Sequence, residues 1–233
     1  MSGQEDAKRA AAGQAVLLVQ PGMRVGLGTG STARHVVDLL AARYRAGELD
    51  GIVGVATSRA TEEQARELGV PITTLDEVTR LDLTVDGTDE VDPDLDLIKG
   101  LGGALLWEKI VARASDRLII VADDSKEVPR LGTRAPVPVE VAPFGWRTHL
   151  EAFRELGARP ELRTRQDASP FVTDGGHFIV DLHFDGGITD ARALDEAVRA
   201  RAGVVETGLF LGMATTVIIA APDDVRTRQR EDT

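Results

Sequence analysis

The sequence predicts an α/β fold: a mostly parallel Rossmann-like sheet with helices on both faces, plus an inserted smaller α+β (ferredoxin-like) domain. The first observation is a regular alternation of apolar strand segments and amphipathic helices along the first half of the chain, which is typical of helix-covered parallel sheets. The second is a glycine-rich turn between the first strand and the next helix, and the third is a change of element order near Gly132. Of the 233 residues, 42% are hydrophobic, which is enough for a substantial core.

The elements of the first half follow from apolar periodicity and from helix start and stop signals. Ser31 or Thr32 is the expected N-cap of the second helix, which stops at Gly47. In order, we expect a helix at 5–19, a strand at 23–28, a helix at 31–47, a strand at 51–58, a helix at 59–69, strands at 70–76 and 81–90, a helix at 102–115 and a strand at 117–125. This order predicts the parallel sheet.

The second half predicts a β-α-β-β-α-β unit, which is a small open-faced α+β domain. Its expected elements are a strand at 135–143, a helix at 146–157, a strand at 158–165, a strand or hairpin at 170–184, a helix at 190–203 and a strand at 204–210. A last strand at 214–222 is expected to return to the main sheet. We therefore expect a larger α/β domain at 1–131 and 208–233, which carries the active site, and a smaller domain at 132–207.

Composition argues against several classes of function. The formal net charge is −11 and only 4% of the residues are aromatic, so a nucleic-acid partner would find neither a basic patch nor a stacking surface. The absence of cysteine excludes disulfides and thiolate zinc sites, and the four histidines have no ligand spacing. No segment resembles a signal peptide or is long enough to span a membrane. We expect a cytoplasmic protein without a membrane partner.

The segment GLGTGSTA at 26–33 follows a strand and opens a helix. Its G-x-G-x-x-A spacing matches a degenerate dinucleotide pattern, but the next strand lacks the terminal acid that binds the ribose of a nicotinamide cofactor. The hydroxyls of Thr29, Ser31 and Thr32, together with backbone N–H groups after Gly30, suit a phosphate monoester better. The alternative is a structural turn with helix-capping hydroxyls.

Acidic residues gather where the strand at 81–90 ends. A calcium-binding EF-hand loop is excluded because its glycine and closing glutamate positions are not filled. A magnesium site, acid/base work on a sugar and a solvated loop remain. Asp86 and Asp89 bracket Gly87 directly at the strand end, so we regard them as site residues. The solvated loop is the preferred interpretation for Glu90, Asp92, Asp94 and Asp96.

Further candidates follow this acidic segment. Lys99 has the charge to neutralise a phosphate or an oxyanion, and Gly100 and Gly102 let the backbone approach a ligand. Glu108 lies in the first turns of the next helix among apolar residues, a setting that raises a carboxylate pKa toward the value a general base needs. An ordinary surface glutamate is the alternative. Lys126 follows another strand and would add a second positive charge.

Four segments stand in a particular order and spacing: GLGTGSTA, DGTDEVD, KGLGGALLWEKI and ADDSK. With the later PVPVEVAPF, FVTDGGHFIVD and GVVETGLF, they resemble the A-type ribose-5-phosphate isomerase family over nearly the whole chain. The resemblance implies reversible conversion of D-ribose 5-phosphate to D-ribulose 5-phosphate, in the non-oxidative pentose phosphate pathway, without a metal or organic cofactor. It also implies a homodimer or a dimer of dimers.

The resemblance places the general base at Glu108. The substrate contacts that it implies are Thr29, Gly30, Ser31, Thr32, Asp86, Gly87, Thr88, Asp89, Lys99, Gly100, Leu101, Gly102 and Lys126. For this substrate we expect Asp86 to open the furanose ring, Asp89 to hold hydroxyls, and Lys99 to stabilise a cis-enediolate. One departure from the family pattern is Trp107, which stands directly before the base where the family often has arginine.

Three rival functions are compatible with a related fold, because fold alone does not fix function. A sugar-phosphate-sensing binding module without catalysis is the main alternative, but the segment before the first strand is too short for a helix-turn-helix. A CoA transferase would use a glutamate nucleophile and need a CoA site, which no sequence feature demands. A nicotinamide dehydrogenase is disfavoured by the missing acid.

Overall fold

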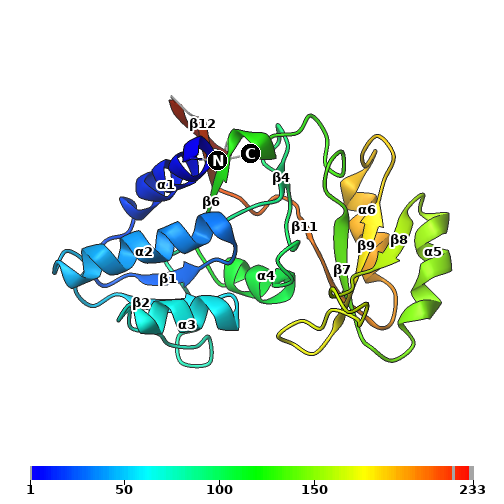
Figure 1. Ribbon diagram of the computed structural model, residues 1–233, viewed down its shortest axis with the longest axis horizontal. Coiled ribbons are helices and arrows are strands. Elements are labelled where there is room, and N and C mark those ends of the chain that lie inside the picture. Colours follow the sequence, from blue (N-terminus) through cyan, green and yellow to red (C-terminus); the bar gives the residue numbers. More distant parts are fainter. Residues whose placement is uncertain (1, 222–223, 231–233) are drawn as a thin grey trace. The chain divides into compact units, whose positions relative to one another are not determined.

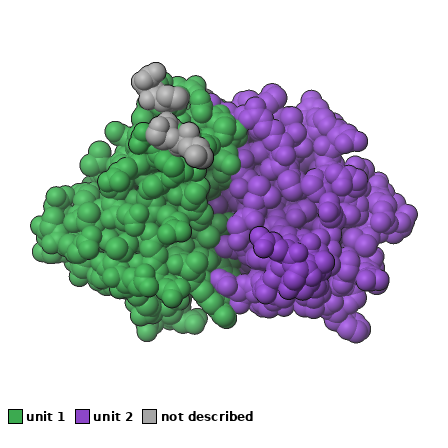
Figure 2. Space-filling model, viewed as in Figure 1, with its two compact units in different colours: residues 1–88, 107–126, 213–233 green, residues 89–106, 127–212 purple. Residues whose placement is uncertain are grey.

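A computed structural model gives the fold of residues 2–221 and 224–230. The chain divides into two compact units (Figure 2). Unit 1 comprises residues 1–88, 107–126 and 213–233, and unit 2 comprises residues 89–106 and 127–212. In the described part of the chain, no helix combines the length and apolarity that a membrane crossing needs.

Unit 1 is built on a six-stranded sheet with the order β13-β12-β6-β3-β1-β2 (Figure 1). Its strands are β1 (Arg24–Leu27), β2 (Val53–Ala56), β3 (Leu83–Asp86), β6 (Leu118–Asp123), β12 (Thr216–Ala221) and β13 (Asp224–Gln229). Its helices are α1 (Ser2–Val16), α2 (Ser31–Arg45), α3 (Arg59–Glu67), most of α4 (Leu105–Arg113) and the short η1 (Asp124–Lys126). All strand pairs are parallel except β12 with β13, which confirms the predicted Rossmann-like sheet.

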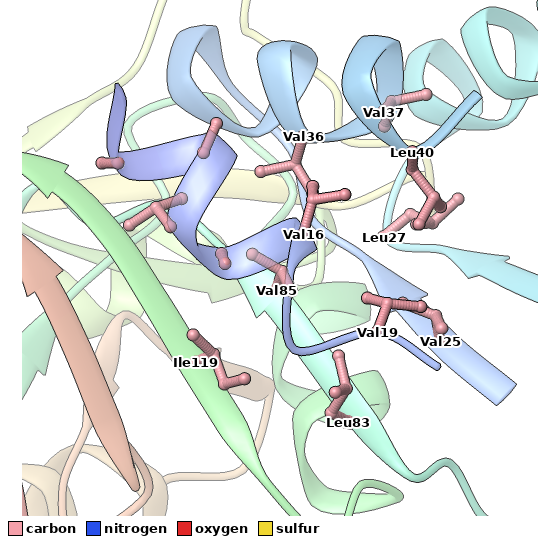
Figure 3. Packing of buried hydrophobic residues seen from close by; sticks show 14 of the residues in the cluster. Val16, Val19, Val25, Leu27, Val36, Val37, Leu40, Leu83, Val85 and Ile119 are labelled. Atoms are coloured by element: carbon pink, nitrogen blue, oxygen red, sulfur yellow. The ribbon is translucent and has the colours of Figure 1, made fainter. Parts of the chain in front are cut away.

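The core of unit 1 shows that helices cover both faces of this sheet. Alternate residues of a strand point to opposite faces. Leu27 of β1 belongs to a buried cluster with Val16 of α1 and Leu40 of α2, as Figure 3 shows. The preceding Gly26 faces the other side, where a Cβ would lie 2.7 Å from Val111 of α4. The alternating apolar pattern of the first half therefore folds as expected.

Unit 2 has a four-stranded antiparallel sheet in the order β10-β7-β9-β8. The strands are β7 (Val137–Val141), β8 (Arg159–Leu162), β9 (Phe178–His183) and β10 (Val204–Thr207), and the helices are η2 (Trp146–His149), α5 (Leu150–Glu155) and α6 (Ala191–Arg199). This is the predicted β-α-β-β-α-β order. Phe153 of α5 and Val198 of α6 share one buried cluster with Val139 and Val180 of the strands. A second antiparallel sheet joins β4 (Glu90–Val91), β5 (Leu97–Ile98) and β11 (Leu209–Phe210).

Two local predictions need correction, and one strand was missed. The strand expected at 70–76 is wrong, because only Ile72 forms an isolated bridge, to Gly54, and proline at position 71 has no N–H to extend a ladder. The expected N-cap at Ser31 or Thr32 is also wrong, since the cap is Gly30. Strand β13 was not predicted, because its residues are mostly exposed and polar. The last predicted strand does return to the main sheet, where β12 pairs with β6; its expected end at position 222 lies outside the described residues.

The boundaries of the two units differ from the expected domains at 1–131 with 208–233 and at 132–207. Residues 89–106, 127–131 and 208–212 group with unit 2 rather than with the larger unit. The reason is that β4, β5 and β11 form their own small sheet. A backbone hydrogen bond also connects residues 89–106 with residues 208–212, because the N–H of Lys99 donates to the carbonyl of Gly208 at 2.9 Å.

Candidate active site

Unit 1 has a topological switch point between β1 and β3. β2 lies on one side of β1 and β3 lies on the other. Parallel strands end at one edge of a sheet, and ligands of open α/β sheets bind beyond those ends at the switch point. The loop from Gly28 to Thr32 follows β1, and Asp86 ends β3. Lys126 closes η1, directly after β6, the neighbour of β3. Three of the predicted segments therefore lie at this edge of the sheet.

Asp86 is held by the backbone of two loops. Its side chain is fully buried, and Oδ1 accepts hydrogen bonds from the N–H of Thr29 at 3.1 Å and of Gly87 at 2.7 Å. Gly28 permits this approach, because a Cβ there would lie 2.2 Å from Asp86 Oδ1 and 2.5 Å from its Cα. The first glycine of the GTG turn thus serves close packing against the carboxylate, which fixes the position of Asp86.

The Thr29 hydroxyl is engaged inside the fold. Its Oγ1 lies 2.8 Å from the hydroxyl of Thr57, 2.8 Å from that of Ser58 and 3.1 Å from that of Thr61. The sequence showed that the second strand lacks a terminal acid, but it did not indicate that the hydroxyls at this strand end contact Thr29. Ser31 is exposed, whereas Thr32 is buried. Of the three predicted phosphate hydroxyls, that of Ser31 is the one on the surface.

The start of α2 differs from the starts of two other helices. Its N-cap, Gly30, has φ 112° and forms no side-chain cap. In contrast, Ser58 caps α3 and Asp190 caps α6 through side-chain oxygens. The first N–H groups of a helix have no partner within the helix, so an end without a capping side chain suits an anion. The observation is consistent with the predicted phosphate-binding turn.

Glu108 lies on the buried face of α4. Its side chain is 4% exposed, and the residues one turn away, Leu105 and Val111, are buried as well. Ile110, another apolar residue of this helix, is 49% exposed, so it does not contribute to the apolar setting that we expected around Glu108. The alternative of an ordinary surface glutamate is therefore wrong. Glu108 is a buried carboxylate on a helix of unit 1.

In unit 2, Asp89 holds the glycine segment that follows Lys99. Asp89 Oδ2 accepts a hydrogen bond from the N–H of Leu101 at 2.9 Å. Lys99 is buried, and its Nζ lies 5.5 Å from the ring centroid of Phe210, a distance suitable for a cation–π contact. The backbone of this segment is thus joined to the Asp89 side chain, whereas the Lys99 side chain contacts Phe210.

The preferred interpretation of Glu90, Asp92, Asp94 and Asp96 as a solvated loop is wrong for two of them. Glu90 is buried and accepts hydrogen bonds from three backbone N–H groups, those of Gly132 (2.6 Å), Arg134 (2.6 Å) and Ala135 (2.7 Å). Asp96 accepts one from Gly212 at 2.6 Å. Asp92 accepts from the N–H groups of Asp94 and Asp96, and burial raises its pKa. These acids stabilise turns within unit 2.

The structure thus places the predicted site residues in two sets. In unit 1, Thr29, Asp86 and Gly87 are in direct contact, and Gly30 to Thr32 and Thr88 continue the same two loops. In unit 2, Asp89 and Lys99 to Gly102 form the second set. Within residues 2–221 and 224–230, no group of three or more histidine or acidic side chains is arranged to hold a metal ion.

Comparisons with known proteins identify the family. The family model "Ribose 5-phosphate isomerase A (phosphoriboisomerase A)" matches residues 53–224. A ribose-5-phosphate isomerase A of Rhodopseudomonas palustris (strain HaA2) is 54% identical over 97% of this chain and 98% of its own, and that of Chloroflexus aurantiacus is 52% identical over 95% and 92%. The solved ribose 5-phosphate isomerase of Plasmodium falciparum superposes with a TM-score of 0.94 at 37% identity, covering 98% of this chain and all of that one. A D-ribose-5-phosphate isomerase solved with phospho-erythronic acid also has a TM-score of 0.94, at 38% identity over 97% and 99%. The chain belongs to the ribose 5-phosphate isomerase A family.

Proposed function

We propose that this chain interconverts D-ribose 5-phosphate and D-ribulose 5-phosphate, with Glu108 as the general base. The observation that carries the proposal is the buried carboxylate of Glu108 on α4, in a chain whose relatives are named for this activity. The loop at the start of α2 provides the kind of N–H groups that bind phosphate. The non-oxidative pentose phosphate pathway is the proposed context.

The chemistry needs opening of the sugar ring and then the transfer of protons between C2 and C1. Asp86 opens the furanose by moving a proton between the C1 hydroxyl and the ring oxygen, which yields the free aldehyde. Glu108 then removes the proton from C2, and the electron pair forms the C1–C2 double bond of a cis-enediolate. Glu108 returns its proton to C1, while the proton of the C2 hydroxyl passes to the C1 oxygen, so that C2 becomes the carbonyl carbon and C1 becomes the hydroxymethyl group. Protons alone move, so the balance requires no external oxidant or reductant.

The relative solved with phospho-erythronic acid supports an enediolate intermediate. That ligand is a phosphorylated four-carbon sugar acid, and its planar, anionic carboxylate holds two oxygens side by side, as the C1 and C2 oxygens lie in a cis-enediolate. Ligands that resemble the reacting state bind more tightly than substrates. In our proposal, Lys99 and Lys126 supply positive charge for the developing anion, and each such donor is worth on the order of 10²–10³ in rate.

The remaining substrate contacts are proposals from the family resemblance. In unit 1 they are Thr29, Gly30, Ser31, Thr32, Gly87 and Thr88, and in unit 2 they are Asp89, Gly100, Leu101 and Gly102. We also propose that the chain works without a metal or organic cofactor, as a homodimer or a dimer of dimers, in the cytoplasm. Trp107 beside the base leaves the proton transfers above unchanged.

The test is ribulose 5-phosphate formation from ribose 5-phosphate in D2O, with EDTA present. The proposal predicts steady turnover and deuterium at C1 of the product, because a proton held by a carboxylate exchanges with solvent. Conversion that ceases when EDTA is added would contradict the metal-free chemistry. Binding of the sugar phosphate without any conversion would replace the proposal with the alternative, a sugar-phosphate-sensing module.

A further inference from the structure

We propose that Arg163 is a positioning residue, which orients the backbone of the Gly100–Gly102 segment for the substrate. The role toward a substrate rests on the proposed function above. The contacts between Arg163 and the segment do not depend on it. Arg163 directly follows β8 and was not singled out by the sequence, because it lies 62 residues beyond the segment it holds.

The guanidinium of Arg163 binds two backbone carbonyls and one carboxylate at the same time. Its Nη1 donates to the carbonyl oxygens of Gly100 at 2.8 Å and of Leu101 at 3.0 Å. Its Nε donates to Asp181 Oδ2 at 2.9 Å, and its Nη2 donates to Asp181 Oδ1. The Arg163 and Asp181 side chains are only 13% and 15% exposed. A bidentate arginine–carboxylate pair fixes the plane of the guanidinium, so Asp181 aims Nη1 at the two carbonyls.

Two peptide groups are oriented by this contact. A trans peptide is planar, and its C=O and N–H point in opposite directions. The carbonyl of Gly100 shares its plane with the N–H of Leu101, which donates to Asp89 Oδ2 at 2.9 Å, so this peptide is fixed from both sides. The carbonyl of Leu101 shares its plane with the N–H of Gly102. Arg163 therefore turns the Gly102 N–H away from itself.

The position of Gly102 makes this orientation relevant to a ligand. A Cβ on Gly102 would meet nothing within 4 Å, and its φ is not in the left-handed region. Neither packing nor backbone geometry therefore requires glycine there, whereas close approach of a ligand to the backbone would. A positive charge on the Leu101 carbonyl also polarises that peptide and strengthens its N–H as a donor. The Gly102 N–H is thus prepared to bind an anionic or hydroxyl oxygen.

The next residues support the same segment. Gly103 N–H donates to the carbonyl of Gly100 at 3.0 Å and closes the turn. Phe171 packs against Gly103 so closely that a Cβ there would lie 2.4 Å from the ring. Arg163 itself lies 5.9 Å from the centroid of the Phe171 ring. The connection between β8 and β9 therefore supplies both the charge and the ring that hold the turn.

The experiment compares Arg163→Lys and Asp181→Asn with the control Arg159→Lys in the full-length protein. Lysine keeps the charge but lacks the planar fork. Arg159, on the same unit's strand β8, is an exposed residue paired with Glu161. Three quantities are measured: kcat and KM for ribose 5-phosphate, the dissociation constant of phospho-erythronic acid by calorimetry, and hydrogen exchange at Leu101 and Gly102. The melting temperature of each variant shows whether it is folded.

For Arg163→Lys we expect kcat/KM to fall on the order of 10²-fold, as small misplacements of binding groups do, with faster exchange at Leu101 and Gly102 and weaker ligand binding. Asp181→Asn should give a smaller loss of the same kind, and Arg159→Lys none. Should Arg163→Lys fail to fold, Asp181→Asn decides, since it retains the guanidinium. Kinetics and exchange within twofold of wild type in these variants overturn the proposal. An inactive wild type refutes the proposed function instead. Hydrogen exchange and the binding of phospho-erythronic acid then test the positioning role of Arg163 without the kinetics.

Discussion

Adjacent glycines at 102 and 103 should respond oppositely to the same substitution. Gly103 has φ +82°, and an added Cβ would lie 2.4 Å from Phe171. Gly102 has open space and no left-handed φ. Alanine at 103 should therefore destabilise the fold, whereas alanine at 102 should affect only a ligand that approaches the backbone.

The magnitude follows from two contributions at Gly103. A left-handed conformation costs an alanine roughly 1–2 kcal/mol, and displacing the Phe171 ring costs roughly 1–3 kcal/mol, at the lower end because a ring tip can shift. For a chain of this size, 1 kcal/mol lowers the melting temperature by about 2–4 °C. We expect Gly103→Ala to melt at least about 4 °C below wild type. Gly102→Ala should stay within about 0.5 kcal/mol of wild type.

The assay combines thermal unfolding with steady-state kinetics on ribose 5-phosphate. Gly102→Ala should unfold like the wild type and lose activity about 10-fold or more, because the new methyl group occupies the space at the backbone where the ligand approaches. The reasoning is refuted if Gly103→Ala melts with the wild type. It is refuted equally if Gly102→Ala is destabilised as much as Gly103→Ala, since the distinction between the two positions is then false.

Three further changes give measurable outcomes. Glu90→Gln should lower the free energy of unfolding in urea by about 1–3 kcal/mol, because one carboxylate now accepts three backbone N–H groups; a loss below about 0.5 kcal/mol would contradict this role. Burial, and second the charge of Arg201, lower the pKa of His149 below its ordinary 6.5, so the unfolded chain binds this proton first as pH falls. The stability of the wild type relative to His149→Gln should be greatest above pH 6.5 and decrease below it; thermal melts showing a pH-independent difference would disprove the assignment. Asp86→Asn should lower kcat by about 10²–10⁴-fold with little change in melting temperature, and an unchanged kcat would remove Asp86 from ring opening.

The sequence predicted the elements that depend on local pattern, whereas the contacts between elements became visible only in the structure. The meeting of Thr29 with Asp86 follows from two neighbouring parallel strands that end at one edge. The buried position of Glu108 follows from helical spacing. The hydroxyl contact between Thr29 and Thr57 was missed, because capping and ligand-binding hydroxyls look the same in a sequence.

Long-range polar contacts could not be predicted. Glu90 belongs to a run of acidic residues, which is typical of a solvated loop. Its partners, however, are backbone N–H groups more than 40 residues away. Backbone donors cannot be recognised from the pattern of side chains. Arg163 is similar, since its partners are two carbonyls and an aspartate that lies on another strand. The expected strand at 70–76 had suitable apolar residues, but only one residue pairs.

The most direct test of the central claim is the initial rate of ribulose 5-phosphate formation by wild type, Glu108→Gln and the control Glu62→Gln. Glu62 is a partly exposed helical glutamate of the same unit, so its substitution measures the effect of removing a carboxylate without removing the base. If Glu108 is the base, Glu108→Gln loses at least about 10²–10⁴-fold in kcat, stays folded and still binds phospho-erythronic acid, while Glu62→Gln keeps the wild-type rate. Equal rates in all three proteins would leave the family assignment intact and contradict the mechanism.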